Sequence, residues 1–445
     1  MIDIKSIFSI FSNISKPQKK FLAKILSISS FFSGKANIKN LCRYGNIAPR
    51  TAYRQIQKDF EFSLLNYAIL KSQGILKHRL VAAMDCSFLK KTGNHTENIG
   101  YFYNSEGQKA EKGLELSGLA LIDLDQHTAY ALDSKLSPGS QSKRERISNI
   151  KTLHFERTRS VQVKGKLKEI HVKTSRTNAY IHSTCPECHR EIAFTTCQFC
   201  EKQETKIDFF LTQIKENIHI LKQVTHHLVV DGFYAKKKFI SGSNDLGLDV
   251  ITKLRVDANL QYLAEISHQE RRRGAPKKYD GKFDVKDLSR FEKTNHQGLV
   301  LYSKEMYSPQ FQRNLKIVVI DHTILCSTDL NLSAQEIFEI YSARFQIEYL
   351  FRDGKSHMGL GDAQVRKSCS LNFQNNACLT ALNLLKLEHR KHQMKQEVIS
   401  IFSYKHQRYN QNLIDLVLSK LGKNPKFYKN HEWYIALKNL GSISA

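Results

Sequence analysis

Tyr341-Ser-Ala-Arg344-Phe-Gln-Ile-Glu348-Tyr-Leu-Phe-Arg-Asp-Gly-Lys355 is the stretch that decides the fold. Read as one helix, it places Tyr341, Arg344, Glu348 and Lys355 within an arc of about 60°, at roughly 100° per residue. One helical face then offers a carboxylate flanked by two cations and a phenol. A carboxylate that holds a metal ion, beside cations that hold phosphate groups, is what phosphodiester chemistry requires.

Two further acids follow apolar stretches that are typical of buried strands. Asp85 comes after the run at 79–84, and Asp231 comes after the run at 226–230. Taken alone, each Asp fits a turn former or helix cap, and Glu348 fits a solvated helix carboxylate. The order Asp85, Asp231, Glu348, together with the face described above, favours one catalytic site instead. Such acids hold two Mg²⁺ ions, or Mn²⁺ in their place, about 3.5–4 Å apart.

The overall composition points to a polyanionic partner. The chain has 445 residues, 41% of them apolar, and a formal net charge of +26. This length predicts two to four domains with true hydrophobic cores. Because the positive charge recurs in dense local runs, nucleic acid is favoured over a basic but merely solvated surface. No apolar stretch approaches the roughly 20 residues of a membrane span, so we expect a cytoplasmic, nucleoid-associated protein without membrane contact.

The N-terminal residues 1–75 read as helical, with a helix start at Pro17. Two short helices, at 38–44 and 49–58, flank the turn at Gly45 and suggest a helix-turn-helix. The second carries four polar side chains suited to a DNA groove: Arg50, Arg54, Gln55 and Lys58. An ordinary three-helix module with a basic face is the alternative.

Four cysteines form two C-x2-C pairs, Cys185 with Cys188 and Cys197 with Cys200, separated by eight residues. Four thiolates in paired knuckles predict a structural Zn²⁺ site. A redox dithiol fits less well, because no βαβ pattern surrounds either pair. His182 and His189 are spare ligand candidates, although each also fits a surface histidine.

Basic runs mark two further segments. Residues 140–180 are polar and rich in Lys and Arg, with little core-forming periodicity, and we interpret them as an insertion or a flexible DNA-contacting stretch. Residues 257–330 contain short β runs and one basic loop that includes Arg271, Arg272, Arg273, Lys277 and Lys278. Solvated loops are the alternative, but a protein of this charge favours phosphate contact.

The spacing Y-x2-R-x3-E-x6-K resembles the signature of one large group of DDE transposases from bacterial insertion sequences. The stretches 327–334, 351–360 and 273–278 also look like family sequence. The resemblance implies an RNase H-like catalytic core and the excision and strand transfer of a DNA element. Asp85 is then the acid expected to bridge both ions, with Asp231 and Glu348 each completing one ion's shell. Arg344 and Lys355 are expected on phosphates, and Tyr341 on a phosphate or stacked on DNA. For the two cations, pairing with Glu348 is the alternative.

The expected architecture is a multidomain α/β protein. A helical DNA-binding domain (1–75) precedes an RNase H-like core in two parts, 76–256 and 331–396. A basic and zinc-knuckle insertion at about 140–202 and a β-rich insertion at 257–330 interrupt this core, and a helical tail spans 397–445. We expect a homodimer or higher oligomer on double-stranded DNA, at element ends and target. Two alternatives remain: a metal-dependent nuclease without strand transfer, and a non-catalytic DNA-binding regulator.

Overall fold

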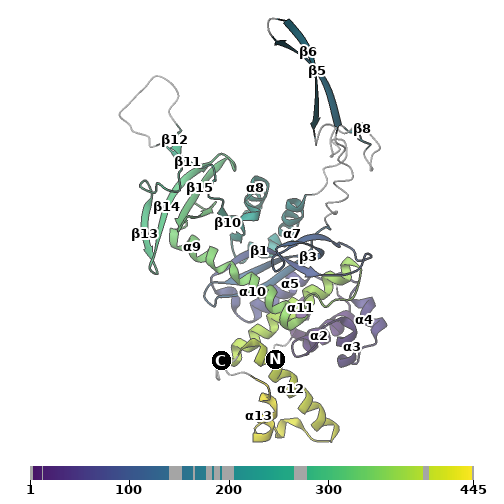
Figure 1. Ribbon diagram of the computed structural model, residues 1–445. Coiled ribbons are helices and arrows are strands. Elements are labelled where there is room, and N and C mark those ends of the chain that lie inside the picture. The colour runs from purple at the N-terminus through teal and green to yellow at the C-terminus, as the bar shows by residue number, and fades with distance from the viewer. Residues whose placement is uncertain are drawn as a thin grey trace.

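The computed structural model describes residues 4–12, 14–139, 153–163, 166–176, 183–184, 191–192, 205–264, 278–393 and 400–442 (Figure 1). The zinc-knuckle cysteines, both spare histidines and most of the basic loop at 271–278 lie outside these residues. No described helix has the length and apolar character needed to cross a membrane.

The N-terminal part is helical, as the sequence predicts. Ser15 caps α2 through the backbone nitrogen of Gln18, and Pro17 lies in its first turn. Asn46 ends α3 in the left-handed conformation, with a φ of 45°, and so turns the chain into α4. The helices of this part are α1 (Ile4–Ile7), α2 (Lys16–Ser29), α3 (Ile38–Gly45), α4 (Pro49–Gln55) and α5 (Phe62–Ser72).

Twelve described strands form one sheet, in the order β12-β11-β14-β15-β16-β10-β9-β1-β3-β2, with β13 beside β14 and β4 beside β3. The central strands β9 and β10 and the first half of β1 are almost completely buried, as expected for strands covered on both faces. The strands are β1 (Leu80–Lys90), β2 (Gly100–Asn104), β3 (Lys109–Asp123), β4 (Thr128–Leu136), β9 (His227–Val230), β10 (Asp249–Leu254), β11 (Gln261–Leu263), β12 (Tyr279–Lys282), β13 (Glu292–His296), β14 (Leu299–Ser308), β15 (Arg313–Ile320) and β16 (Thr323–Ser327).

The core half of the sheet mixes two kinds of pairing. Strands β4, β3 and β1 are antiparallel neighbours, whereas β9 and β10 run parallel to β1. Helix α7 (Lys206–Leu221) precedes β9, and α8 (Lys237–Asp245) connects β9 to β10. This arrangement is α/β, and it is consistent with the RNase H-like core that the resemblance implies.

The strands of the β-rich segment continue the core sheet. β16 pairs antiparallel with β10 over Ile251–Leu254, and β15 and β14 follow outward from β16. The segment at 257–330 therefore extends the sheet that carries the acids, and it is not a separate layer (Figure 1).

Part of the basic stretch at 140–180 is regular structure. β5 (Leu153–Val163) and β6 (Lys166–Arg176) pair along their whole length in a two-stranded sheet of their own. β7 (Ser183–Thr184) and β8 (Glu191–Ile192) form a second small pair. Residues 153–163 and 166–176 therefore form a hairpin outside the main sheet, which fits the expected insertion.

The signature stretch is two helices and a wider turn, and the expectation of one uninterrupted helix is wrong. A capping box between Ser333 and Glu336 starts α9 (Ala334–Ala343). Arg344 stands between α9 and α10 (Phe345–Asp353), and a π-helix, η4 (Gly354–Met358), follows directly. The C-terminal helices are α11 (Ser368–Gln393), α12 (Ile401–Lys420) and α13 (Glu432–Asn439).

Helix α11 covers the free edge of the sheet. The side-chain amide oxygen of Asn383 accepts a hydrogen bond from the backbone N–H of Ala131, and its amide nitrogen donates one to the Ala131 carbonyl. Asn376 makes the same two bonds with Ser134. Farther along α11, Lys386 donates to the carbonyl of Ala129. Side chains of a helix thus satisfy the backbone groups that an edge strand leaves unpaired, which closes β4 to another strand.

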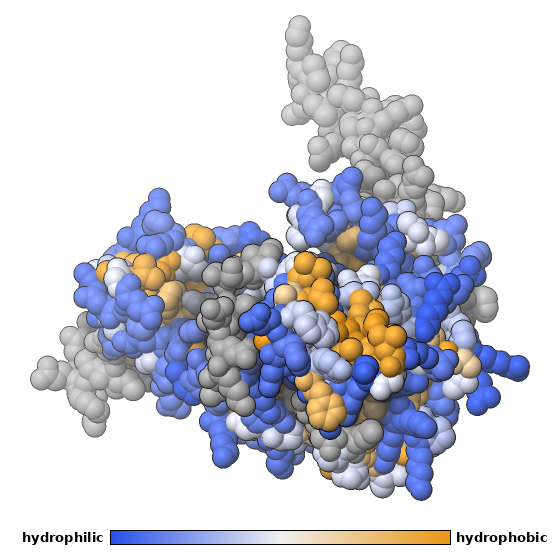
Figure 2. Space-filling view, turned by 90° about the horizontal axis from the view of Figure 1, so that it is seen from below, coloured by the Kyte–Doolittle hydropathy of each residue, from blue (hydrophilic) through white to orange (hydrophobic). Residues whose placement is uncertain are grey.

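The C-terminal helices expose an apolar surface. Helices α12 and α13 lie at the lower end of the molecule in Figure 1 and face the viewer in Figure 2, where apolar residues gather amid a largely hydrophilic surface. On α12, Leu416 is 56% and Val417 57% exposed, and Leu421 just beyond the helix is 68% exposed. Contiguous exposure of this kind is typical of an interaction surface.

We expect Asn383→Leu to destabilise the protein by about 3 kcal/mol or more, because it leaves both backbone groups of Ala131 buried and unpaired. The measurement is the free energy of unfolding from urea titration. Asn375→Leu is the matched control, because Asn375 is a buried amide on the same helix whose nitrogen has no partner. Equal losses for the two variants would contradict the role given to α11.

Candidate active site

The parallel register of β1 and β9 places two acids side by side. Met84 of β1 is paired with Val230 of β9, so the next residues along the two strands are Asp85 and Asp231. Asp85 lies within β1, and Asp231 caps the short 3₁₀ helix η3 (Gly232–Tyr234). Because neighbouring strands lie about 4.8 Å apart, both carboxylates lie at the same end of the β1–β9 pair.

Helix α10 brings the third acid to the same place. Gly118 of β3 is paired with Asp85, and the ring of Phe351 fills the space where a side chain at 118 would lie. A Cβ atom at Gly118 would come within 2.6 Å of that ring. Because Phe351 is three residues after Glu348, this close approach sets Glu348 above β1. Across β3, Ser117 bonds to Gln213 of α7, so α7 and α10 pack on opposite faces.

Arg344 joins two of the three acids. Its guanidinium donates to Asp85 Oδ2 at 3.1 Å and to Glu348 Oε1 at 2.9 Å. The residue is only 8% exposed, and its Nε has no hydrogen-bond partner. The pairing with Glu348 considered in the sequence analysis is thus present, and the second bond to Asp85 is an addition that spacing along one helix does not reveal.

Burial dominates the electrostatics of Asp85. The pKa of Asp85 is raised to about 6, mainly by desolvation, and the neighbouring carboxylates of Glu348 and Asp231 add smaller contributions in the same direction. The backbone nitrogen of Cys86 and the Arg344 guanidinium act in the opposite direction. Like charges gathered in a partly buried place are typical of functional sites. They raise the free energy of the folded protein unless a cation compensates them.

Residues 200–384 match the family model of the transposase DDE domain. This match supports a DDE transposase. Asp231 and Glu348 lie within the matched residues, whereas Asp85 precedes them and joins them through the sheet. No curated protein matches the chain. The DDE domain implies an enzyme that acts on DNA, with cleavage that depends on divalent metal ions.

The residues at the DDE site fit such ions. Three carboxylates from β1, from the end of β9 and from α10 supply only hard oxygen ligands, which Mg²⁺ prefers. Arg344 pairs with only two of these partly buried carboxylates, so a bound metal cation would offset the negative charge that remains. Asp85, Asp231 and Glu348 thus offer a ligand set that fits a divalent metal ion.

The other two signature residues differ in their surroundings. The Arg344 guanidinium lies 5.8 Å from the centre of the Tyr341 ring, so Tyr341 borders the acids. Lys355 lies in the π-helix, whose wider turn shifts it from the position that a continuous α-helix gives. It lines a cavity formed with residues 31–35 and α12. In the described part of the chain no hydrogen bond or ion pair joins Lys355 to Glu348. Burial lowers the pKa of Lys355, and the carboxylate of Glu106 partly opposes that shift.

The second helix of the predicted helix-turn-helix presents a basic face. Arg50 and Arg54 of α4 and the following Lys58 are exposed, as DNA contact requires. Gln55 is buried, 4% exposed, so its assignment to the DNA-contacting face is wrong. Of the basic loop at 271–278, Lys278 alone is described and is exposed.

Residues that the sequence analysis did not single out support the acids from behind. Thr252 Oγ1 donates to the carbonyl of Asp231 at 3.1 Å and fixes the backbone there. The Cys86 thiol lies 3.5 Å from the Tyr234 hydroxyl, and burial raises the pKa of both groups. Tyr234 is buried among the rings of Phe210 and Phe239. A neutral, packed layer therefore lies beneath the charged site.

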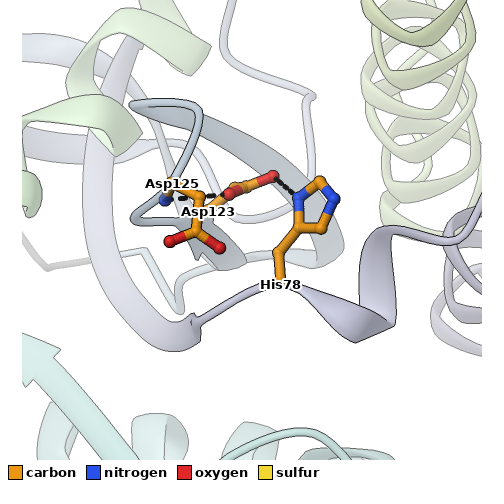
Figure 3. Close-up of side chains that lie close together, drawn as sticks. All are labelled: His78, Asp123 and Asp125. Carbon is orange, nitrogen blue, oxygen red and sulfur yellow. Dashed lines mark hydrogen bonds and ion pairs between the residues drawn. The ribbon is translucent and has the colours of Figure 1, made fainter.

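A second group of acids lies at the other end of β1 (Figure 3). His78 Nδ1 is 2.6 Å from Asp123 Oδ2, and Asp123 Oδ1 accepts a hydrogen bond from the backbone N–H of Asp125. Asp125 in turn accepts the backbone nitrogen of Arg79. Asp123 pairs with Leu80, five residues before Asp85, or about 16 Å at about 3.3 Å per residue. Since protein groups already bind these oxygens, the group ties the β3–β4 turn to the start of β1.

We expect Asp85→Asn to become progressively stabilising, relative to the wild type, as pH rises from about 4 to 7 in EDTA. The folded-state pKa of Asp85, about 6, exceeds its usual 3.8, so the folded protein binds more protons in this window. Wild-type stability therefore falls with rising pH by up to about 3 kcal/mol, a loss the variant avoids.

Thermal unfolding midpoints at pH 4, 5, 6 and 7 measure this difference. Asp257→Asn is the matched control, because Asp257 is an exposed acid paired with Arg255, and its difference from wild type stays small at every pH. A difference between Asp85→Asn and wild type that does not change with pH would show that the Asp85 carboxyl is not desolvated.

Proposed function

We propose that the chain is the transposase of a bacterial insertion sequence and that it excises a DNA element and joins it to target DNA by phosphodiester hydrolysis and transesterification. The observation that carries the proposal is the convergence of three acids from separate elements: Asp231 lies beside Asp85 in the sheet, and Arg344 joins Asp85 to Glu348. The Tyr-Arg-Glu-Lys spacing supports the narrower group.

The chain's own residues would position the DNA strand. Asp85, Asp231 and Glu348 would hold two Mg²⁺ ions, which supply Lewis acidity for the attack by water or a 3′-hydroxyl. Arg344 already contacts two acids, so a scissile phosphate near the ions would give its guanidinium a third anionic partner. Tyr341, beside Arg344, would bond to a phosphate or stack on a base.

DNA on either side of the site would meet other basic groups. We assign phosphate contacts to Arg50, Arg54, Lys58, Lys355 and the basic loop at 271–278. The exposure of the first three and the net charge of +26 support this assignment. We further propose a homodimer or higher oligomer on double-stranded element ends in the nucleoid. The apolar surface of α12 and α13 supports that part of the proposal, since a single chain leaves it exposed.

We expect purified protein, given Mg²⁺, the inverted-repeat DNA that flanks its gene and a plasmid target, to yield cleaved and joined products on a sequencing gel. EDTA removes both products. Glu348→Gln lowers their rate at least ~10²-fold, because one metal ligand is lost. Glu339→Gln is the matched control, since Glu339 is on the adjacent helix and pairs with Arg79.

The products distinguish the alternatives. Cleavage without joined products would favour a nuclease on the same fold. Binding to the repeats without cleavage under any divalent metal would leave a DNA-binding regulator and overturn the enzymatic proposal.

We also propose that Cys185, Cys188, Cys197 and Cys200 hold one structural Zn²⁺ ion, on the strength of their spacing. Metal analysis by mass spectrometry should find about one zinc per chain, and Cys185→Ser with Cys200→Ser should remove it. Cys369→Ser is the control, because Cys369 is a free, exposed cysteine. Zinc retained by the double variant would contradict the proposed ligand set.

A further inference from the structure

A cavity of about 370 Å³ lies where three distant segments of the chain meet. Its walls are residues 31–35 between α2 and α3, the π-helix η4 with the turn that follows it, and the first half of α12. The π-helix directly follows α10, which carries Glu348. A π-helical turn is frequently a mark of functional sites, and this one joins the cavity to the helix of the DDE site.

Close backbone contacts fix the walls. Gly359 has a φ of 77°, and a Cβ atom there would lie 2.6 Å from the Cβ of Ala36. Asp362 Oδ2 accepts a hydrogen bond of 2.9 Å from the backbone N–H of Ala36. The segment from the N-terminal helices is therefore clamped against the turn after η4. The cavity is a built feature of the fold, because no side chain fits at Gly359 without moving this contact.

The cavity is lined by cations that have no acidic partner in it. Lys405 is only 7% exposed and donates to the carbonyl of His357. Among the described residues no carboxylate forms an ion pair with Lys405, and burial lowers the pKa of Lys405 to about 8. Lys355 and Lys35 also line the cavity. Asp362 is the acid in the lining, and its Oδ2 accepts a backbone N–H. A buried ammonium without a counter-ion favours an anionic ligand.

Aromatic rings stand beside these cations. Phe402 stacks on His406 with ring centres 6.2 Å apart, and His357 lies 5.1 Å from Phe402. Phe402 is 46% exposed and lines the cavity, so part of its ring is accessible to a ligand. Nδ1 of His357 is buried without a hydrogen-bond partner. Rings that alternate with cations are the surface on which nucleotides bind, the rings against the base and the cations against the phosphate.

We propose that this cavity binds one phosphate group of a DNA strand together with its attached nucleoside. Lys405 and Lys355 bind the phosphate, and Phe402 and His406 contact the nucleoside. A cavity of this volume lies within the usual range for small-ligand sites. The inference rests on the proposed function for its source of nucleotides, and it adds α12 and residues 31–35 to the surface that holds the substrate.

Lys405→Met tests the charge, because it keeps most of the apolar stem and removes the ammonium. The measurement is fluorescence anisotropy with labelled element-end DNA, repeated from about 50 to about 300 mM salt, a range over which the Debye length shortens about twofold. The variant should bind more weakly than the wild type. The magnitude of its slope of log K against log salt should be smaller by about 1. Lys405→Arg should restore the slope. Lys420→Met, an exposed lysine at the far end of the same helix, should leave both unchanged.

Phe402→Leu tests the ring. It should weaken binding by about tenfold with an unchanged salt slope, because stacking carries no charge. Circular dichroism and the thermal midpoint of each variant establish that it is folded. A wild-type salt slope in folded Lys405→Met, or unaltered affinity in folded Phe402→Leu, would overturn the proposal.

Calorimetry with inorganic phosphate and with deoxyadenosine monophosphate separates the two sources of the phosphate. A DNA-strand site binds these small molecules weakly. An excess of either one should therefore reverse little of the anisotropy change that DNA binding produces. Tight monophosphate binding that Lys405→Met removes, with DNA affinity unchanged, would mean a free-nucleotide site and overturn the assignment to DNA. If the wild-type protein cleaves and joins DNA and the Lys405→Met variant has the wild-type salt slope, the cavity proposal alone is refuted. Wild-type protein that binds no DNA refutes both proposals.

Discussion

The pairing of β1 with β9 is the constraint on which the rest of the site depends. Because Met84 is opposite Val230, Asp85 and Asp231 come to one point although 146 residues separate them in sequence. A slip of one residue would turn every side chain of the strand to the other face and separate the acids. Burial of both strands makes such a slip costly, since the apolar residues at 81–84 and 228–230 would lose their contacts.

The same constraint creates an electrostatic conflict. Burial of the Asp85 carboxylate is the main reason that its pKa is raised, and repulsion from Glu348 and Asp231 adds to the rise. Arg344 offsets part of it, and it does so from the junction of α9 and α10, where its own burial would be unfavourable without the two acids. The site therefore holds charge that the fold alone does not need, as functional sites commonly do.

Local patterns predicted the strands that precede the two Asp residues, but they did not predict the contacts between distant segments. Apolar runs before Asp85 and Asp231 and the capping box at Ser333 are local signals, and the structure has β1, β9 and α9 at these places. The helical period did not predict the break at Arg344 or the π-helix at Gly354. This part of the chain makes close contacts between Phe351 and Gly118 and between Gly359 and Ala36. These contacts join residues more than 200 positions apart, and no helical period contains them. The burial of Gln55 was missed for the same reason, since tertiary packing decides which face of a short helix is inside.

The N-terminal helices are part of the catalytic body, and this has a consequence for how DNA is held. Asn66 of α5 bonds to Asn383 of α11, while Phe62 packs edge-on against Phe373. Asp362 holds Ala36 from the turn after the π-helix. Buried polar contacts of this kind fix orientation as well as adding stability, because each leaves an unpaired group when the two parts move. DNA bound at the exposed face of α4 would thus be oriented relative to Glu348 by rigid packing, and no flexible linker would need to be ordered first.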